Sequence, residues 1–335
     1  MSAMLDPAAN GITIIAGINV ALADAMADDD KVLVLGEDVA DPEGGGIIGA
    51  TKGLSTRFGA ERVRSTPISE QAIIGAAIGA SLAGWKPVAE IMLMNFTAVA
   101  MDMIVNHAAK LRFMSGGQTH VPITIRTMTG SGFGNGGQHS DYLEAWFAHT
   151  AGLKVVAPSN PADAYGLLRS CIDDPDPCLF IENLPGYWIT GDAPAPNHRV
   201  PIGSARVVRQ GTDVTVISYS RMVTEAIKAL ELTSAAGMSV ELVDLRSISP
   251  WDERTVTESA AKTGRVLIVH EAVTKFGVGA EIAATLSDKL FGKLKKPVMR
   301  LGAPYAPVPF SKPLETAYAP DAARIANAVK TLVMG

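Results

Sequence analysis

Short runs of branched apolar residues alternate with stretches of helical periodicity along most of the chain, and this alternation restricts the possible folds most strongly. Thr13 can cap a helix whose apolar positions recur at helical spacing as far as Met26, and a buried strand is expected next at 32–35. The pattern then repeats, with strands expected at 87–93, 121–126, 153–157 and 178–182 and helices at 69–82, 97–114 and 161–171. Strands that alternate with helices form a parallel sheet covered by helices on both faces. The sequence therefore predicts the α/β class.

The alternation is interrupted once, in a stretch at 184–204 that is rich in proline and glycine. Its breakers are Pro185, Gly186, Gly191, Pro194, Pro196, Pro201 and Gly203. Afterwards strands are expected at 214–218, 239–244, 266–270 and 298–301, and helices at 222–232, 252–261, 280–289 and 322–333. Because such stretches commonly separate domains, we expect two three-layer α/β domains at 1–190 and 205–335, joined by a linker at 191–204.

The composition limits the class of partner. The 335 residues carry a formal net charge of -5, which argues against nucleic acid or an anionic membrane as the main partner. Charged residues make up 19% of the chain, below the roughly 25% usual in soluble proteins, whereas apolar residues make up 47%. Small residues crowd the helix expected at 69–82, where glycine is unfavourable unless another backbone packs closely. The sequence therefore predicts surfaces that are buried against other chains.

No segment indicates a membrane span or a secretion signal, because polar residues interrupt the one apolar stretch near the N-terminus. The two cysteines, Cys171 and Cys178, match no zinc spacing and suit core positions in a reducing compartment. We therefore expect a cytoplasmic protein.

Polar residues lie where ligands bind in open α/β sheets, beyond the carboxyl ends of strands. They are Glu37, Glu70 at the start of the small-residue helix, His139 in a glycine-rich loop, and the pair His270–Glu271. Position alone does not exclude purely structural roles for these residues. Glu70 could only stabilise the helix dipole, by about 0.3–1 kcal/mol. His139 could be an ordinary surface histidine instead of an acid, a base or a carboxylate binder.

The glycine-rich loop at 130–137 is expected to be mobile or to face a ligand. Gly132, Gly134 and Gly137 satisfy the spacing G-x-G-x-x-G, so an NAD-binding dehydrogenase that uses this loop is one hypothesis. The dinucleotide fingerprint requires an apolar helix to begin at the last glycine, but here the polar sequence Gln-His-Ser-Asp-Tyr follows. The match is therefore weak.

An ordered set of motifs carries a closer resemblance over essentially the whole chain. The set consists of Gly36-Glu-Asp-Val39, the loop from Gly44 to Gly53 with Lys52 and Leu54, Arg57-Phe-Gly59, Thr66-Pro-Ile-Ser-Glu70, Asn95-Phe96, Asn106-His-Ala-Ala-Lys110, Gln138-His-Ser140, Leu143-Glu-Ala-Trp-Phe147, Gly152-Leu-Lys-Val-Val156, Pro158-Ser159 and His270-Glu-Ala272. In order and spacing, the chain resembles the β subunit of a thiamine-diphosphate-dependent 2-oxo acid dehydrogenase, the decarboxylating first component. The acetoin dehydrogenase β subunit is a close relative of that family.

The resemblance implies a pyrimidine-binding domain followed by a domain of the transketolase C-terminal type. It also implies roles for particular residues. Glu70 would hydrogen-bond a ring nitrogen of the cofactor's aminopyrimidine and favour the tautomer that acts as a base, and Phe96 would pack against that ring. Glu37, Ile68, Ser69 and Met92 would line the same pocket. His139 would orient the substrate and assist acyl transfer to a lipoyl group.

The resemblance further implies a partner chain. In this family an α subunit holds the diphosphate and magnesium through a Gly-Asp-Gly motif, and this chain has only Gly191-Asp192 followed by alanine. We therefore expect an α2β2 heterotetramer that is inactive without its α subunit, and a lipoyl-bearing dihydrolipoyl acyltransferase as a further partner. A non-catalytic interaction subunit with the same fold is the alternative.

Two further expectations come from the resemblance. The family's β subunits often hold potassium, and the matching positions here are Ile123, Cys171, Ile172, Asp174 and Asp176. The same segment, 173–177, could equally be an ordinary turn at a helix end. Met103 and Asp141 stand where many relatives have glutamine, which weakens the assignment of one substrate. Pyruvate is the expected substrate, with acetoin and branched-chain 2-oxo acids as alternatives.

Overall fold

The computed structural model describes residues 11–335, so the first ten residues of the expected N-terminal domain lie outside the described part. The chain forms two compact units. Unit 1 comprises the residues up to Thr129 together with Trp146–Ile202, and unit 2 comprises Gly130–Ala145 together with Gly203–Gly335. The expected linker at 191–204 covers the passage into unit 2 at residue 203, but the segment 130–145 also belongs to unit 2.

Unit 1 is built on parallel strands in the order β6-β7-β5-β4-β2-β3. Their bounds are β2 (Val32–Gly36), β3 (Val63–Ser65), β4 (Lys86–Leu93), β5 (Thr124–Thr129), β6 (Lys154–Val156) and β7 (Cys178–Asn183). A separate antiparallel pair is formed by β1 (Gly11–Thr13) and β8 (Thr190–Asp192). The parallel arrangement follows from the alternation of strands and helices in the sequence.

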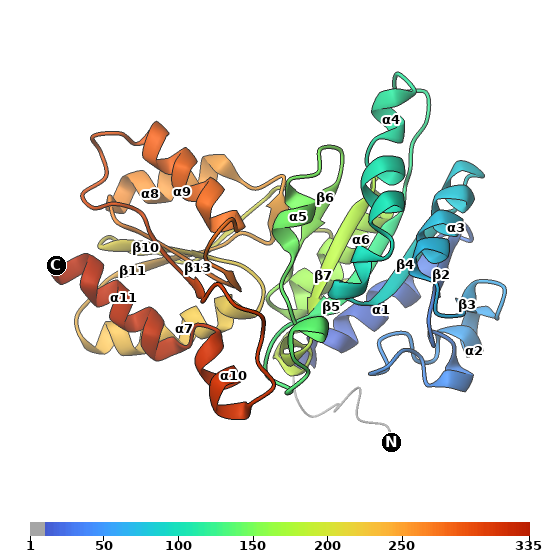
Figure 1. Cartoon of the computed structure of the whole chain (residues 1–335), viewed down its shortest axis with the longest axis horizontal. Helices are drawn as coiled ribbons and strands as arrows, with labels where there is room; N and C mark the ends of the chain where they lie inside the picture. Colours follow the sequence, from blue (N-terminus) through green and yellow to red (C-terminus); the bar gives the residue numbers. More distant parts are fainter. Residues whose placement is uncertain (1–10) are drawn as a thin grey trace. The chain divides into compact units, whose positions relative to one another are not determined.

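Helices cover both faces of this sheet (Figure 1). On one face α1 (Ile14–Asp28) packs against α6 (Pro161–Asp173), and both share a core with alternate strand residues such as Val34, Val88 and Phe180. On the other face α3 (Glu70–Leu82) packs against β4 and β2. The expected cap of α1 is confirmed, because Thr13 Oγ1 accepts a hydrogen bond from the Ala16 N–H at 3.2 Å.

The single helix expected at 97–114 is wrong. The structure has the 3-10 turn η2 (Met94–Ala98), the π-helix η3 (Met103–Ala108) and the short α4 (Leu111–Met114). The Ala109 N–H donates to the Ile104 carbonyl at 3.1 Å, and this five-residue spacing encloses one residue more than an α-helical hydrogen bond. Changes in helix type of this kind leave the apolar spacing similar, so periodicity did not reveal them.

Unit 2 contains a second sheet in the order β14-β13-β10-β11-β9, parallel except for the antiparallel edge strand β9. Its strands are β9 (Arg206–Arg209), β10 (Val214–Ser218), β11 (Val240–Asp244), β13 (Val266–Val273) and β14 (Met299–Ala303), and the short β12 (Ser247–Ser249) also lies in this unit. Its helices are α7 (Arg221–Ala235), α8 (Glu253–Thr263), α9 (Val278–Lys289), α10 (Lys312–Tyr318) and α11 (Ala322–Met334). The short α5 (Glu144–Ala148) begins in unit 2 at the end of the segment 130–145 and continues into the residues of unit 1.

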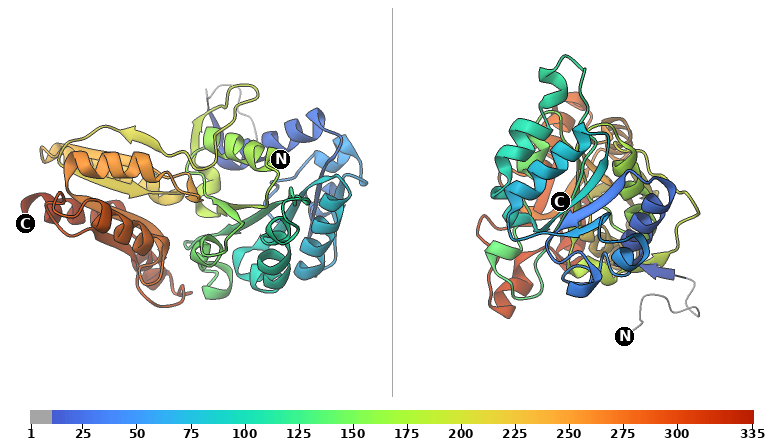
Figure 2. Two further views of the ribbon diagram at one scale, coloured as in Figure 1. Left: turned by 90° about the horizontal axis from the view of Figure 1, so that it is seen from above. Right: turned by 90° about the vertical axis from the view of Figure 1, so that its right-hand side faces the viewer.

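The helices of unit 2 also lie on both faces of their sheet, as Figure 1 and Figure 2 show. The helices α7 and α11 pack together and share one core with β10, β11 and β13, while α8 contacts β10 and α9 contacts β13. The prediction of two three-layer α/β domains is therefore confirmed. None of the helices within residues 11–335 combines the length and apolar character needed to cross a bilayer.

Candidate cofactor site

Five of the six residues assigned to cofactor binding follow from how three neighbouring parallel strands end. The strand β2 pairs with both β3 and β4, so Gly36 lies beside Ser65 and beside Glu90. Glu37 comes directly after β2, and the turn after β3 leads through Ile68 and Ser69 into α3. Because the strands are parallel, these connections leave the sheet at the same edge. Met92, the sixth residue, lies on β4 shortly before its end.

Glu70 is the first residue of α3, and its side chain is buried with 7% of the residue exposed. The Ser69 carbonyl accepts the Ile73 N–H at 2.9 Å and starts the helix, whereas the Ser69 hydroxyl turns back to the Pro67 carbonyl at 3.2 Å. Within residues 11–335, no hydrogen bond or ion pair reaches the Glu70 carboxylate. The Glu70 oxygens are not among the fully enclosed side-chain atoms that lack a partner, so the carboxylate is an acceptor that a ligand can reach.

Glu37 forms a second buried acidic group at this edge. Burial raises the pKa of its carboxyl, and the nearby carboxylates of Glu70, Asp38 and Glu90 raise it further. Neighbouring groups of one charge favour protonation because two close carboxylates resist ionising together. The edge therefore places Glu37, whose surroundings favour its protonated form, close to Glu70.

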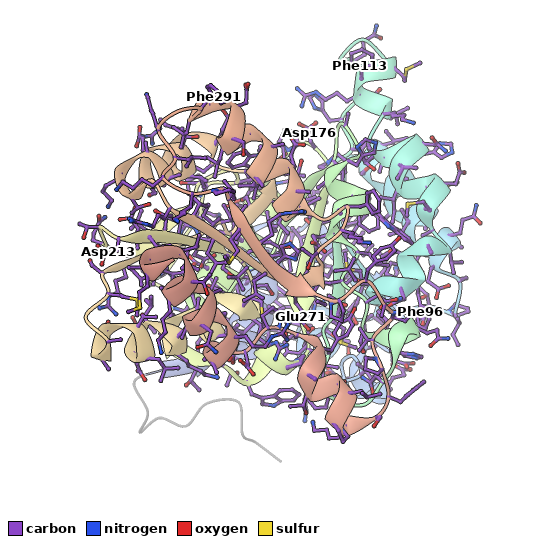
Figure 3. All side chains as sticks on the ribbon, turned by 60° about the vertical axis from the view of Figure 1, so that its left-hand side comes forward. Phe96, Phe113, Asp176, Asp213, Glu271 and Phe291 are labelled. Carbon is purple, nitrogen blue, oxygen red and sulfur yellow. The ribbon has the colours of Figure 1, made fainter. Side chains whose placement is uncertain are left out.

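Apolar side chains stand beside these acids. Met92 and Phe96 are both partly buried and pack against the core of unit 1. Phe96 lies on η2, just past the end of β4 (Figure 3). Ile68 is 82% exposed, which is unusual for a large apolar residue next to a buried acid. Acids next to exposed apolar surface suit a ligand with a flat, partly polar ring.

The loop between β2 and α2 (Leu54–Phe58) is held by Asp41. Its carboxylate accepts hydrogen bonds from the Gly53 N–H at 2.5 Å, the Ser55 hydroxyl at 2.9 Å and the Thr56 N–H at 2.7 Å. Burial alone would raise the pKa of Asp41, but these hydrogen bonds outweigh it and lower the pKa to about 2. Asp41 thus caps α2 although it lies at least twelve residues earlier in the sequence. The same contacts fix the loop at 42–52 between Asp41 and the helix.

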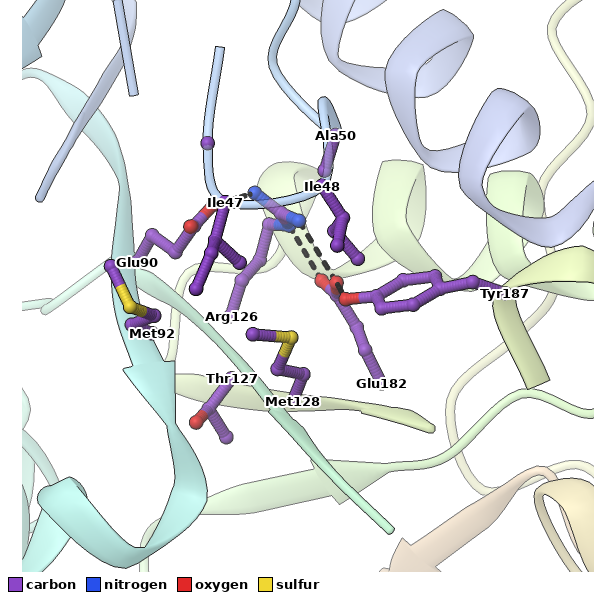
Figure 4. Close-up of a pocket in the computed structure, with 11 residues that line it drawn as sticks. Ile47, Ile48, Ala50, Glu90, Met92, Arg126, Thr127, Met128, Glu182 and Tyr187 are labelled. Atoms are coloured by element: carbon purple, nitrogen blue, oxygen red, sulfur yellow. Dashed lines mark hydrogen bonds and ion pairs between the residues drawn. The ribbon is translucent and has the colours of Figure 1, made fainter. Parts of the chain in front are cut away.

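A buried ionic cluster lies behind this loop, in a small pocket lined also by Ile47 and Ile48 (Figure 4). Arg126 on β5 donates to Glu182 Oε1 at 2.6 Å and Oε2 at 2.9 Å, and to Glu90 Oε2 at 2.6 Å. The Tyr187 hydroxyl also donates to Glu182. The free space is about 10 Å³, roughly room for one water molecule. The cluster is a filled structural element, not a substrate pocket.

The cluster holds one cation against two carboxylates. Burial alone would lower the pKa of Arg126, but Glu182 and Glu90 raise it, so the guanidinium stays charged. Burial raises the pKa of Glu90, and the carboxylate of Glu182 raises it further, against the effect of Arg126. Sequence reasoning missed this cluster. The available signal was an arginine and two glutamates inside segments expected to be buried strands.

The glycine-rich loop at 130–137 is anchored within unit 2. The N–H groups of Gly132 and Gly134 donate to Glu315 at 2.6 and 3.0 Å, and the Ser131 N–H donates to Glu271 at 2.7 Å. Side chains of the chain itself therefore occupy the amides that would bind a diphosphate, and the loop leads into the short 3-10 turn η4 (Gly137–His139) instead of a long helix. The NAD-binding hypothesis finds no support in this geometry.

His270 and Glu271 do not follow their strand as expected. The strand β13 continues to Val273, and both residues are buried within it. The His270 Nδ1 lies 3.0 Å from the Ala272 carbonyl, and burial lowers its pKa to about 4, so the imidazole is neutral near pH 7. The ring of Tyr219 stacks on His270 with 6.3 Å between ring centres. These residues build the interior of unit 2.

Glu144, the first residue of α5, is buried in the same unit. The Tyr219 hydroxyl donates to its Oε1 at 2.6 Å. Burial raises the pKa of Glu144 to about 7, against the effect of that hydrogen bond. Two of the buried titratable groups of unit 2, Glu144 and His270, thus contact the same tyrosine, Tyr219.

The five residues assigned to potassium lie around one turn in unit 1. The Ile123 carbonyl accepts the Cys178 N–H at 3.0 Å, and the Cys171 carbonyl accepts the Asp174 N–H at 3.3 Å. Ile172 is buried next to Cys171 at the end of α6, and the Asp176 N–H donates to Asp174 Oδ1 at 2.9 Å. The two cysteines are free and buried, as expected for core positions.

Both carboxylates of this turn already have cationic partners. Lys154 Nζ lies 2.6 and 2.7 Å from the two oxygens of Asp174, and Arg112 lies 2.6 and 2.7 Å from those of Asp176. The carboxylates therefore do not fit a potassium site as free ligands, and only main-chain carbonyls suit one. Within residues 11–335, there is no group of three or more histidine, cysteine or acidic side chains arranged to hold a metal ion.

Comparison with known families agrees with this architecture. Residues 10–186 match the family described as the transketolase pyrimidine-binding domain, and residues 203–325 match the transketolase C-terminal domain. A solved structure described as a split-gene transketolase, an inactive β4 tetramer, has a TM-score of 0.79 at 22% identity and covers 97% of this chain and 99% of that one. The fold and the site thus define a transketolase-like chain with a pyrimidine-binding domain.

Curated relatives narrow the family. The acetoin:2,6-dichlorophenolindophenol oxidoreductase β subunit of Cupriavidus necator is 41% identical over 98% of this chain and 99% of its own length. The pyruvate dehydrogenase E1 β subunit of Leifsonia xyli is 39% identical (97% and 95%), and the 3-methyl-2-oxobutanoate dehydrogenase β subunit of Mycobacterium tuberculosis is 42% identical (90% and 87%). The chain belongs to the family of β subunits of pyruvate, acetoin and branched-chain 2-oxo acid dehydrogenases.

Proposed function

We propose that this chain is the β subunit of a heterotetrameric 2-oxo acid dehydrogenase that uses thiamine diphosphate and passes an acyl group to a lipoyl-bearing acyltransferase. The observation that carries the proposal is the pair of buried acids, Glu37 and Glu70, at the edge of a pyrimidine-binding domain. Glu70 lacks a hydrogen-bond partner within residues 11–335, and an aminopyrimidine ring nitrogen supplies one.

Each residue of the proposed site has its own role in binding the cofactor or the substrate. Thiamine diphosphate, when bound, supplies the electron sink for decarboxylation. Glu70 holds a proton at the ring nitrogen, and Glu37 maintains the acidic surroundings of that contact. Phe96, Met92, Ser69 and Ile68 hold and shield the ring. His139 orients the substrate, since an imidazole can donate to a carboxylate or a carbonyl near neutral pH.

Exposed apolar surface supports the need for partner chains. On α3 the small residues Ala72, Ala76 and Gly79 are exposed and allow another backbone to approach closely. Phe113 at the tip of α4 is 87% exposed (Figure 3). The α subunit is proposed to cover such surface and to supply the diphosphate and magnesium site.

Reconstitution tests the proposal. The chain is co-expressed with an α subunit that carries Gly-Asp-Gly, and reduction of 2,6-dichlorophenolindophenol is measured with thiamine diphosphate, magnesium and either pyruvate, acetoin or 3-methyl-2-oxobutanoate. We expect turnover with pyruvate, and a loss of about 100-fold or more in Glu70→Gln, within the range typical of a lost acid–base contact. Glu61→Gln, at an exposed site of the same unit, is the control and should leave turnover unchanged.

The outcomes separate the alternatives. Preference for acetoin, the substrate in the name of a 41% identical relative, would make this an acetoin dehydrogenase β subunit. A stable αβ complex that binds no thiamine diphosphate would favour a non-catalytic interaction subunit. Full activity of Glu70→Gln would refute the assigned role of Glu70.

The proposal also includes a potassium site in unit 1. Potassium is proposed to bind main-chain carbonyls at the turn of Asp174 and Asp176, and the melting temperature should then be higher in potassium chloride than in the same concentration of tetramethylammonium chloride. Equal melting temperatures would favour an ordinary turn held by Lys154 and Arg112.

The cytoplasmic location stays a prediction and is tested by fractionation of cells expressing the chain.

A further inference from the structure

The segment that carries His139 is bound to the rest of unit 2 by two buried carboxylates. Glu315 on α10 accepts hydrogen bonds from the Gly132 N–H at 2.6 Å and from the Gly134 N–H at 3.0 Å. Glu271 on β13 accepts both the N–H and the hydroxyl of Ser131, at 2.7 and 3.0 Å. Both glutamates are at most 4% exposed. These contacts link residues more than a hundred positions apart in the sequence.

The backbone of the segment is shaped for this contact. Gly130, Gly132, Gly134 and Gly136 all have positive φ, between 70° and 137°, which residues with side chains rarely adopt. Turns of this kind direct successive N–H groups into one concavity that binds an anion. Glu315 fills the concavity, and its buried charge is compensated by main-chain amides, which hydrogen-bond ionised groups strongly.

The far end of the segment is held by the stretch that leads into α10. A side chain at Gly136 would lie 2.5 Å from the ring of Phe310, and one at Gly137 would lie 3.2 Å from Pro307. The Val308 N–H approaches Asp141 Oδ1 at 3.5 Å. The turn η4 starts at Gly137, and the His139 N–H donates to the Gly136 carbonyl at 3.3 Å. The backbone of His139 is therefore fixed between the glutamate anchors and the 307–310 stretch.

We propose that Glu315 is a positioning residue for His139: it acts on the backbone of 132–134 and thereby sets where the imidazole stands when substrate binds. Glu271 supports the start of the same segment. The inference rests on the proposed role of His139 in substrate orientation. It assigns the C-terminal unit a part in catalysis through the contacts of Glu271 and Glu315 with the 131–134 segment.

The test compares Glu315→Ala with Glu315→Gln in the assembled αβ complex. Alanine removes every acceptor of the glycine amides, whereas glutamine keeps one oxygen and should rescue in part. Thr316→Ala, at an exposed neighbouring position of α10, is the matched control. The readouts are amide hydrogen exchange of residues 130–141, the binding constant for thiamine diphosphate, and kcat and KM for the substrate identified by reconstitution.

We expect Glu315→Ala to raise hydrogen exchange in 130–141 at least about tenfold, since loss of these acceptors leaves the amides without partners. We expect kcat/KM to fall about 100-fold, with cofactor binding unchanged and with Glu315→Gln intermediate. Unchanged exchange would overturn the anchoring. Raised exchange with unchanged kcat/KM would show a purely structural contact and would also overturn the proposal.

A failure of the proposed function looks different. In that case the unmodified complex would turn over none of the three substrates, and the role of Glu315 in positioning would fall with it. The exchange measurement would still report whether Glu315 holds the segment. If Glu315→Ala does not fold, Glu315→Gln provides the same comparison, with smaller expected changes of the same sign.

Discussion

Two buried sites, one in each unit, hold acidic side chains in different ways. In unit 1 a charged arginine lies between Glu90 and Glu182, so the cluster is ionic. In unit 2 the buried Glu144 accepts a hydrogen bond from the hydroxyl of Tyr219, and its second oxygen, Oε2, has no hydrogen-bond partner in the described part of the chain. A guanidinium keeps its charge over the whole accessible pH range, whereas burial raises the pKa of Glu144 to about 7, so this carboxyl takes up a proton near neutral pH. The comparison indicates that the Arg126 cluster is sensitive to loss of a partner and that the environment of Glu144 is sensitive to pH.

The largest effect is expected from removing the cation of unit 1. Arg126→Met leaves two buried carboxylates without their partner, and breaking a buried pair in this way costs about 3–5 kcal/mol. Urea denaturation measures the loss in the free energy of unfolding. Arg254→Met, which breaks an exposed pair with Glu258, is the control and should change stability by about 0.5 kcal/mol or less. Equal losses in the two variants would contradict the special role of the buried cluster.

Glu144→Gln should change how stability depends on pH. The pKa of Glu144 is raised to about 7 from a usual value of 4.5, so the folded state binds a proton more tightly than the unfolded state between these values. The contribution of Glu144 to the free energy of unfolding is therefore fully present below pH 4.5. It is lost as pH rises to 7, by about 3 kcal/mol at most. The glutamine variant lacks this loss and should be more stable than the original chain above pH 7. Denaturation at pH 4.5, 6 and 8 would show it, and parallel curves would refute it.

His270→Gln should remove a dependence of stability on pH that has the opposite sign. The pKa of His270 is lowered to about 4 from 6.5, so the unfolded state binds the proton more tightly. The contribution of His270 to the free energy of unfolding is present above pH 6.5 and is lost as pH falls to 4, again by about 3 kcal/mol at most. The two slopes largely cancel in the original chain between pH 4.5 and 6.5. Each single variant should therefore reveal the slope of the other residue, and a double variant should show neither.

The smallest effect is expected at the Asp41 cap of α2. Asp41→Asn removes a carboxylate whose pKa is lowered to about 2, and loss of a capping side chain costs about 1 kcal/mol. The contribution is present above pH 3.8 and is lost as pH falls through 2. Thermal unfolding at pH 7 measures it, and the exposed Asp102→Asn is the control. A loss as large as that of Arg126→Met would mean that the loop, not only the helix cap, depends on Asp41.

The sequence predicted the repeating framework well because apolar periodicity follows burial directly. The cap at Thr13 and most helix bounds were found within a few residues. The expected helix at 97–114 failed because the π-turn near Ile104 changes the hydrogen bonding without a clear change in apolar spacing. The strand expected at 121–126 begins at Thr124 instead, after a tight turn in which the Ile123 N–H donates to the Val121 carbonyl at 2.8 Å.

The site was predictable only in part. Glu37 and Glu70 follow from strand ends and from family resemblance, and the structure places both at one sheet edge. Glu271 was noted in the sequence as part of a pair with His270, but its anchoring contact was not predicted, and Glu315 was not noted at all, because both contacts depend on distant amides of the 130–137 loop. A glycine-rich loop predicts an anion, but it does not say whether the anion is a ligand or a side chain of the same chain.

The assignment of 130–145 to unit 2 has a consequence for dissecting the molecule. The chain passes between the units at 129–130, at 145–146 and at 202–203. A fragment cut in the proline-rich stretch would keep the glycine segment but lose both of the glutamates that hold it. Expressing the N-terminal part alone should therefore yield a polypeptide with an open, protease-sensitive segment, and only a construction that splices out 130–145 could separate the two units cleanly.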